Sequence, residues 1–281
     1  MDKGNLWGIL KDFGGWRLSK WVSILTFPGF LAVVGFCYLR NAVWFSSDAL
    51  NDGLMLSHIH SSMALFGYVL VPLFFVFILR YQGAISSVEM PLLRDRRWGY
   101  MGAVMGSLMV AIHVQWDAAE RAGRQMRMIR GVLGQEQTNQ LREALTLTRT
   151  PAEESAQLLS HELQRYAWVV FLALLLLYTM IFFGRKLSIH MSAVTAIVLS
   201  VGLSLYRLSS AVQRSHKAFG ANLELMGLQG SSFLYGRFLP VGLAMLLIIY
   251  WARRKEKAHS HSELVGGMLL GGIVVGVLSV F

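Results

Sequence analysis

Two histidines stand in the sequence where their side chains could bind one cofactor. His60 and His113 lie within long apolar runs, where an ionisable side chain is rare and marks a functional site by default. Counted at ~1.5 Å per residue from the ends of their runs, both lie ~7 Å below the same surface of a ~30 Å hydrocarbon slab. Two imidazoles at one depth on consecutive helices are what bis-histidine haem ligation requires. We therefore predict that His60 and His113 bind the same cofactor, haem b.

Glycines share helix faces with both histidines. Gly67 follows His60, and Gly102 and Gly106 precede His113, at spacings that place each set on one side of a helix. A glycine beside a ligand would let a flat macrocycle approach the backbone. In the alternative interpretation, the glycines only bring two helices into contact.

Other potential ligands lie near the same end. His58 points about 200° away from His60 on a helix and is the weaker candidate of the two. Asp117 follows His113 by one turn, where a carboxylate can orient a metal-bound imidazole. A copper or zinc site built from His58, His60, His113 and Asp117, with His216 as a further ligand, is the alternative to haem.

Two arginines follow His113 along the same predicted helix. Haem propionates need cationic partners, and arginine pairs with carboxylates bidentately. Arg121 and Arg124 are therefore predicted to bind propionates. The alternative is a solvated surface on which Glu120 and Glu136 balance the arginines.

Residues 56–72, LSHIHSSMALFGYVLVP, resemble helix 2 of the haem-copper oxidase catalytic subunit. In that family a histidine near the outer face ligates the low-spin haem, and Met, Phe and Pro follow that histidine after about four, six and eleven residues. In this sequence Met63, Phe66 and Pro72 follow His60 after three, six and twelve residues. The resemblance implies a low-spin-haem-like role for His60. It does not extend to oxygen reduction, because the later histidines that hold copper and the second haem are missing.

A second resemblance concerns the other histidine. The pair His113 and Asp117 is similar to the His-x-x-x-Asp pair with which cation diffusion facilitators bind zinc between helices.

The sequence contains no Gly-rich phosphate loop, Gly-x-Ser-x-Gly elbow, His-Glu-x-x-His or Cys-x-x-Cys-His. Any haem would therefore be held without a covalent bond.

The elements that position these residues are predicted to be membrane helices. Of 281 residues 54% are hydrophobic and 15% charged, whereas soluble domains carry roughly 25% charged residues. The apolar residues gather into runs near the ~20 residues that span a bilayer. We predict an all-α, polytopic membrane helix bundle with about seven transmembrane helices, near 21–40, 55–79, 98–118, 166–184, 188–209, 233–251 and 264–281.

The rest of the chain divides around these runs. Residues 1–20 are predicted to lie on the membrane as an amphipathic interfacial segment. Transmembrane helices 1–3 occupy 21–118, a helical cap on the outer face occupies 119–165, and transmembrane helices 4–7 occupy 166–281. Pro28 is expected to kink the first helix unless neighbouring groups satisfy the carbonyl that it frees.

Local signals add detail at three places. Thr150 caps a predicted helix that Pro151 opens within the cap. The fifth helix is expected to overshoot its span. Glycines in the last helix are spaced as two small-xxx-small pairs, which predict a close helix contact, and these pairs are Gly267 with Gly271 and Gly272 with Gly276.

Charge predicts the orientation. The net charge is +10, but most basic residues flank apolar runs, so we read them as orienting helices rather than binding nucleic acid. Basic clusters at 94–97, 185–186 and 253–257 place the N-terminus in the cytoplasm, and we expect the inner membrane of a bacterium. The single cysteine, Cys37, excludes a disulfide within the chain.

These features together favour a membrane-embedded redox subunit similar to a b-type cytochrome. It would pass electrons between quinol in the lipid bilayer and an acceptor on the outer face, as an oxidoreductase subunit among other subunits of a membrane complex. Two alternatives stay open. One is a cation-binding transporter component, and the other is a cofactor-free structural subunit of a larger complex.

Overall fold

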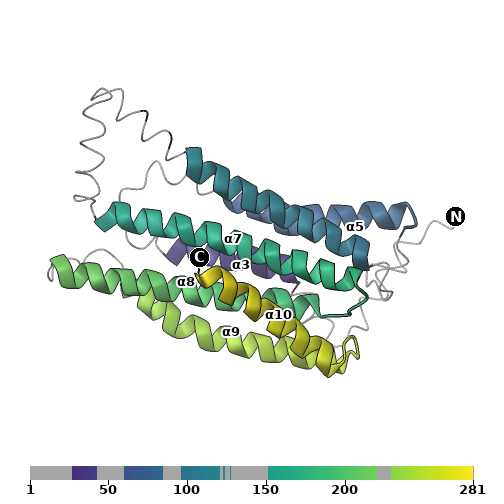
Figure 1. Cartoon of the computed structure of the whole chain (residues 1–281). Helices are drawn as coiled ribbons and strands as arrows, with labels where there is room; N and C mark the ends of the chain where they lie inside the picture. Colours follow the sequence, from purple (N-terminus) through teal and green to yellow (C-terminus); the bar gives the residue numbers. More distant parts are fainter. Residues whose placement is uncertain are drawn as a thin grey trace, which may run out of the picture.

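The structure is a computed structural model that describes residues 27–42, 60–84, 96–120, 123, 127, 151–219 and 229–280. Within these residues every regular element is a helix. The helices run roughly along one common direction (Figure 1). The predicted all-α bundle is confirmed at this level. The interfacial segment 1–20 and nearly all of 121–150 in the predicted cap lie outside the described residues.

Helices cover nearly all of the described part of the seven apolar runs. One continuous run begins at His60 and contains a π-helical turn, η2. A further helix covers 96–120. The remaining elements are α3 (Pro28–Ala42), η2 (Phe66–Leu70), α5 (Val71–Tyr81), α7 (Pro151–Phe182), α8 (Ile189–Phe219), α9 (Gln229–Lys255) and α10 (His261–Val280).

Four stretches are long and apolar enough to cross a membrane, namely His60–Tyr81, Ser160–Phe182, Ile189–Ser210 and His261–Val280. They indicate that the chain is a membrane protein. Within the described residues α3, the 96–120 helix and α9 are not among these four.

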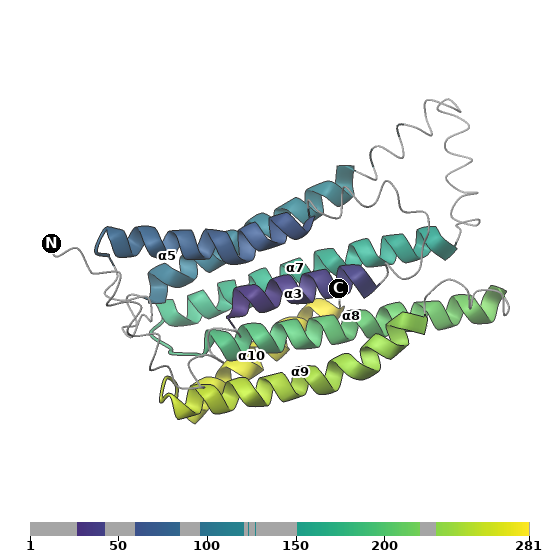
Figure 2. The ribbon, with the colours of Figure 1, turned by 180° about the vertical axis from the view of Figure 1, so that it is seen from behind.

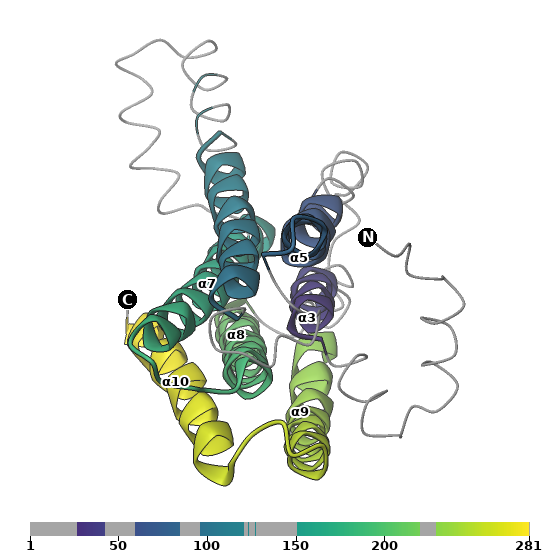
Figure 3. The same ribbon diagram turned by 90° about the vertical axis from the view of Figure 1, so that its right-hand side faces the viewer.

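Helix α8 is the centre of the bundle. It packs against α3, α7, α9 and α10, and the view along the bundle places it between them (Figure 3). Its span is rich in small and β-branched residues such as Ala193, Ala196 and Val201, which are at most 3% exposed. Small side chains allow several helices to approach one helix closely.

Two prolines show how helices begin. Pro28 is the first residue of α3, and Phe27 before it is not helical. The predicted kink at Pro28 is therefore wrong, because the missing N–H of proline costs nothing at the first helical position. Helix α7 begins at Pro151 as predicted, but it runs unbroken to Phe182. The second cap helix and the fourth apolar run are thus one helix.

The predicted overshoot of the fifth helix is confirmed, because α8 reaches Phe219. Helix α9 contains Pro240 within its 27 residues and follows a bent path (Figure 2), as expected where proline removes a backbone hydrogen bond.

Helix α10 begins with a capping box. The Ser260 hydroxyl accepts from the Glu263 N–H at 3.3 Å, and the Glu263 carboxylate accepts from the Ser260 N–H at 3.2 Å.

Candidate functional site

The helix that begins at His60 and the 96–120 helix touch through two glycines. A Cβ built on Gly67 would lie 2.6 Å from the backbone oxygen of Gly106, and a Cβ on Gly106 would overlap the backbone oxygen of Gly67. Only glycine permits so close an approach of two backbones. A Cβ on Gly102 would lie 2.8 Å from Phe75 Cβ. The glycines therefore pack the two helices together, as in the alternative interpretation of the sequence.

This contact sets His60 and His113 at one level. Each lies seven residues, about two turns or ~10 Å, from its own glycine. The two imidazole rings have centroids 5.3 Å apart and planes inclined by 54°. His60 is 7% exposed, and His113 is partly buried. The structure thus brings together the two histidines paired by the sequence prediction.

Asp117 reaches across the helix pair. Its Oδ2 lies 3.1 Å from Nε2 of His60, and both side chains are largely buried. The sequence spacing predicts that Asp117 supports His113 on its own helix, whereas this contact is with the histidine of the neighbouring helix. When the His60 proton is on Nε2, it is donated to the carboxylate, and Nδ1 keeps its lone pair.

His113 has an unused nitrogen. Its Nε2 is buried and has no hydrogen-bond partner within the part of the chain that the structure describes. A buried polar atom without a partner calls for an explanation such as a bound ion or ligand. No three His, Cys, Asp or Glu side chains of the described ranges converge so as to hold a metal ion as they stand.

A π-helical turn separates His60 from the lower part of its helix. The N–H of Val71 donates to the oxygen of Phe66, five residues back. Pro72 has no N–H to offer to Tyr68, so the regular bonding pattern cannot continue there. The freed Tyr68 carbonyl lies against Gly29 of α3, where a Cβ would overlap it. Such turns are frequent at functional sites.

Helix α3 supplies a cation to the same region. The Arg40 guanidinium donates to the Ser61 hydroxyl, and Cys37 Sγ lies 3.8 Å from that hydroxyl. Ser61 is the residue after His60. Sequence reasoning missed Arg40 as a site residue, and the only available signal was its place in the last turn of the first apolar helix.

A buried carboxylate lies at the same end of the bundle. Glu162 of α7 is 1% exposed. Its Oε1 lies 2.7 Å from Arg165 Nη1 and 3.6 Å from Arg207 Nη1, and its Oε2 accepts from the Ser204 hydroxyl at 2.6 Å. Arg207 also donates to the backbone oxygen of Ser279 at 2.7 Å. This network joins α7, α8 and α10, and the sequence analysis did not find it.

Several predicted ligands cannot be placed. His58, Arg121 and Arg124 lie outside the described residues. The backbone of His216 belongs to α8, but its side chain is outside the described part. Their predicted roles stay predictions.

The opposite end of the bundle holds a second buried histidine. His259 lies between α9 and α10, is 4% exposed, and its Nδ1 lies 2.9 Å from Glu263 Oε2. Burial and the positive charge of Arg253 lower the pKa of His259 to about 4, although the hydrogen bond to Glu263 acts in the other direction. The sequence treats it as an ordinary loop position, because the packing that buries it comes from other helices.

No family model, curated protein or solved structure matches this chain.

Proposed function

We propose that the chain is a membrane-embedded redox subunit similar to a b-type cytochrome, in which His60 and His113 ligate a haem. The observation behind the proposal is the pair of imidazoles that two neighbouring helices bring to one level, 5.3 Å apart between centroids. Two nitrogens each ~2 Å from one metal ion lie at most ~4 Å apart. The observed ring separation suits that distance after small rotations of the side chains.

The donor atoms support this role. His113 has a buried Nε2 without a partner in the described structure, and Asp117 Oδ2 lies 3.1 Å from Nε2 of His60. A carboxylate on the far nitrogen fixes an imidazole ligand and raises its basicity. Haem would supply one-electron transfer between quinol and an acceptor, while the residues of this chain hold and orient it.

A cation near the pair supports haem as the cofactor. Arg40 is bonded to the residue after His60, and it joins Arg121 and Arg124 as a candidate partner for propionates. The resemblance of 56–72 to a low-spin-haem helix is part of the same proposal. A π-helical turn holds one residue more than a regular turn, and η2 lies before Pro72. That extra residue accounts for a proline at twelve rather than eleven after His60.

The wider topology belongs to the same proposal. We place three further spans in α3, the 96–120 helix and α9, which gives seven with the four apolar helices. The N-terminus is then cytoplasmic, in a bacterial inner membrane, and His60 and Glu162 lie toward the outer face below a helical cap.

A smaller ligand is the second candidate. The contact between Gly67 and Gly106 closes the helix pair on one side of the histidines, and a single metal ion needs no slot for a macrocycle. His60, His113 and Asp117 offer two nitrogens and a carboxylate, which suit zinc or copper. A cation-binding transporter component would use them in this way after His113 turns toward the His60–Asp117 pair.

The test is the cofactor content of the purified full-length chain. A reduced-minus-oxidised spectrum and pyridine haemochrome measure haem, and elemental analysis measures metal. We expect about one haem per chain, lost in His60→Ala and in His113→Ala. Asp117→Asn should weaken binding about 10- to 100-fold.

His161→Ala is the matched control, because His161 is an exposed histidine of α7 near the same end of the bundle. His259 is unsuitable for this purpose, since it is buried and bonded. Zinc or copper without haem would favour the second candidate. A wild-type protein with neither, or a full haem complement in His113→Ala, would end the haem proposal.

A further inference from the structure

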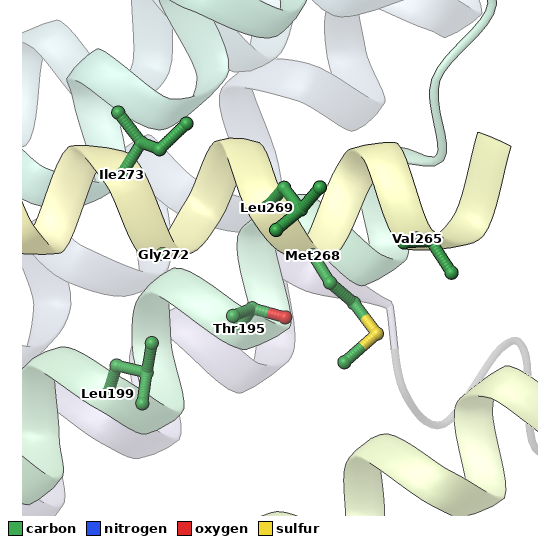
Figure 4. Close-up of a pocket in the computed structure, with 7 residues that line it drawn as sticks. All are labelled: Thr195, Leu199, Val265, Met268, Leu269, Gly272 and Ile273. Carbon is green, nitrogen blue, oxygen red and sulfur yellow. The ribbon is translucent and has the colours of Figure 1, made fainter. Parts of the chain in front are cut away.

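An apolar groove lies between α8 and α10, at the end of the bundle away from His60. The open groove has a volume of about 500 Å³, within the range of ligand sites. Figure 4 shows Thr195 and Leu199 on the α8 side, facing residues of α10. The lining consists of Thr195, Leu199, Val265, Met268, Leu269, Gly272 and Ile273.

The groove exists because α10 uses only one of its two glycine pairs. A Cβ on Gly267 would lie 2.7 Å from the backbone oxygen of Ser188, and a Cβ on Gly271 would overlap the backbone of α8. A Cβ on Gly272 would meet only a Leu199 methyl at 3.9 Å, and one on Gly276 would meet nothing within 4 Å of the described structure. The second pair therefore faces open space.

One side chain in the groove lacks a hydrogen bond. Thr195 is 5% exposed, and its Oγ1 has no partner within the described residues. A helical threonine can bond to the carbonyl four residues back, but this one does not. A buried hydroxyl without a partner costs about 1–3 kcal/mol, so an occupant with an acceptor atom would relieve that cost.

Basic residues are concentrated in the segments near the end of the groove that begins at Val265. Val265, its first lining residue on α10, is one turn from the start of that helix. Lys186 lies beside this first turn, 3.7 Å from Glu263. The segments 185–186 and 253–263 contain six basic residues against two acidic ones, and these are Arg185, Lys186, Arg253, Arg254, Lys255 and Lys257 against Glu256 and Glu263.

We propose that this groove binds an anionic phospholipid. The acyl chain lies along Leu199, Met268 and Leu269, the basic connection between α9 and α10 holds the phosphate, and the Thr195 hydroxyl donates to an ester carbonyl. The basic residues near the start of α10 favour an anionic lipid over a partner helix as the occupant. A partner helix would use the open glycines, but it would not need basic residues at that end. Each basic residue near an anionic headgroup contributes about 1 kcal/mol.

The test is lipid binding to the full-length chain in detergent, counted by native mass spectrometry. The probes are phosphatidylglycerol and phosphatidylcholine with identical acyl chains. We expect one tightly bound phosphatidylglycerol and a preference over phosphatidylcholine of about tenfold. Arg254→Gln with Lys257→Gln should reduce the preference and leave phosphatidylcholine binding unchanged.

Two variants test the groove itself. Gly272→Leu fills it and should abolish the bound lipid, whereas Gly276→Leu, the same change one turn on, should not. Thr195→Val keeps the shape of the side chain and should weaken binding about fivefold, which tests the site even if Gly272→Leu does not fold. Equal binding of both lipids overturns the proposal, as does full retention by Gly272→Leu. A cross-link between two copies through Gly272→Cys, with no bound lipid, would assign the groove to a second copy of the chain.

Discussion

Gly271 and Gly272 are neighbours on α10, and they should respond oppositely to the same substitution. A Cβ at Gly271 would overlap the Ser192 backbone oxygen and lie 3.0 Å from the Ala196 backbone nitrogen. Backbone atoms cannot move aside as a flexible side chain can. At Gly272 the new methyl would meet only Leu199 Cδ1 at 3.9 Å, an ordinary contact distance.

The magnitude follows from two effects. Replacing glycine by alanine within a helix gains up to about 1 kcal/mol at either position. Overpacking at Gly271 costs about 1–3 kcal/mol, because α8 and α10 must move apart. The gain is common to both variants, so the difference between Gly271→Ala and Gly272→Ala isolates the overlap, about 1–3 kcal/mol. Gly272→Ala should be neutral or slightly stabilising.

Reversible unfolding in mixed detergent micelles, followed by circular dichroism, measures this difference directly. The adjacent variants control for each other, since they share helix, depth and chemistry. Equal free energies of unfolding, or a larger loss in Gly272→Ala, would mean that α10 does not pack on α8 through the Gly271 face.

Other perturbations test separate parts of the bundle. Glu162→Ala leaves two arginines without their carboxylate and should cost about 3 kcal/mol, seen as a lower Tm, whereas Glu162→Gln keeps one accepting oxygen but not the charge and should cost less; a wild-type Tm in Glu162→Gln would refute the ionic role. The lowered pKa of His259 means that the unfolded chain takes up a proton near pH 6.5 and the folded chain only near pH 4. Stability should therefore fall as the pH drops between these values, and His259→Gln should flatten that part of the Tm profile. In the proposed topology a cysteine at Gln137 reacts with an impermeant reagent from outside the cell, and labelling only from the cytoplasmic side would invert the bundle.

The sequence predicts features that depend on distance along one helix. The rise of a helix is fixed, so residue counting places His60 and His113 at one level, and the structure brings their rings together. Hydropathy predicts where the helices lie for the same reason, because the number of consecutive apolar residues can be counted within each run. The start of α7 at Pro151 is also local, because proline favours the first helical position.

Features that depend on how helices are rotated against each other could not be predicted. The contact between Asp117 and His60, and the contact between Arg40 and Ser61, each join two helices. No pattern within one helix fixes that angle. Glu162 is similar, because its partners on α8 lie more than forty residues away in the sequence. The same limit applies to Gly67, Gly102 and Gly106. A helix face without side chains can accommodate either a haem or the backbone of a second helix, and the sequence does not distinguish the two.

The π-helical turn makes the histidine pair respond differently to a lost residue at different places in the chain. One residue advances a regular helix by about 100°, whereas the wide turn holds one residue more than a regular turn for nearly the same rotation. A deletion within Phe66–Leu70 that restores regular pitch would therefore leave α5 and His60 facing nearly as they do now. A deletion in the regular turn between His60 and Phe66 would instead swing His60 by roughly 100° away from His113. In evolutionary terms, a lineage could lose one residue at the π-helical turn and keep this site, and could lose the site by the same change a few residues earlier.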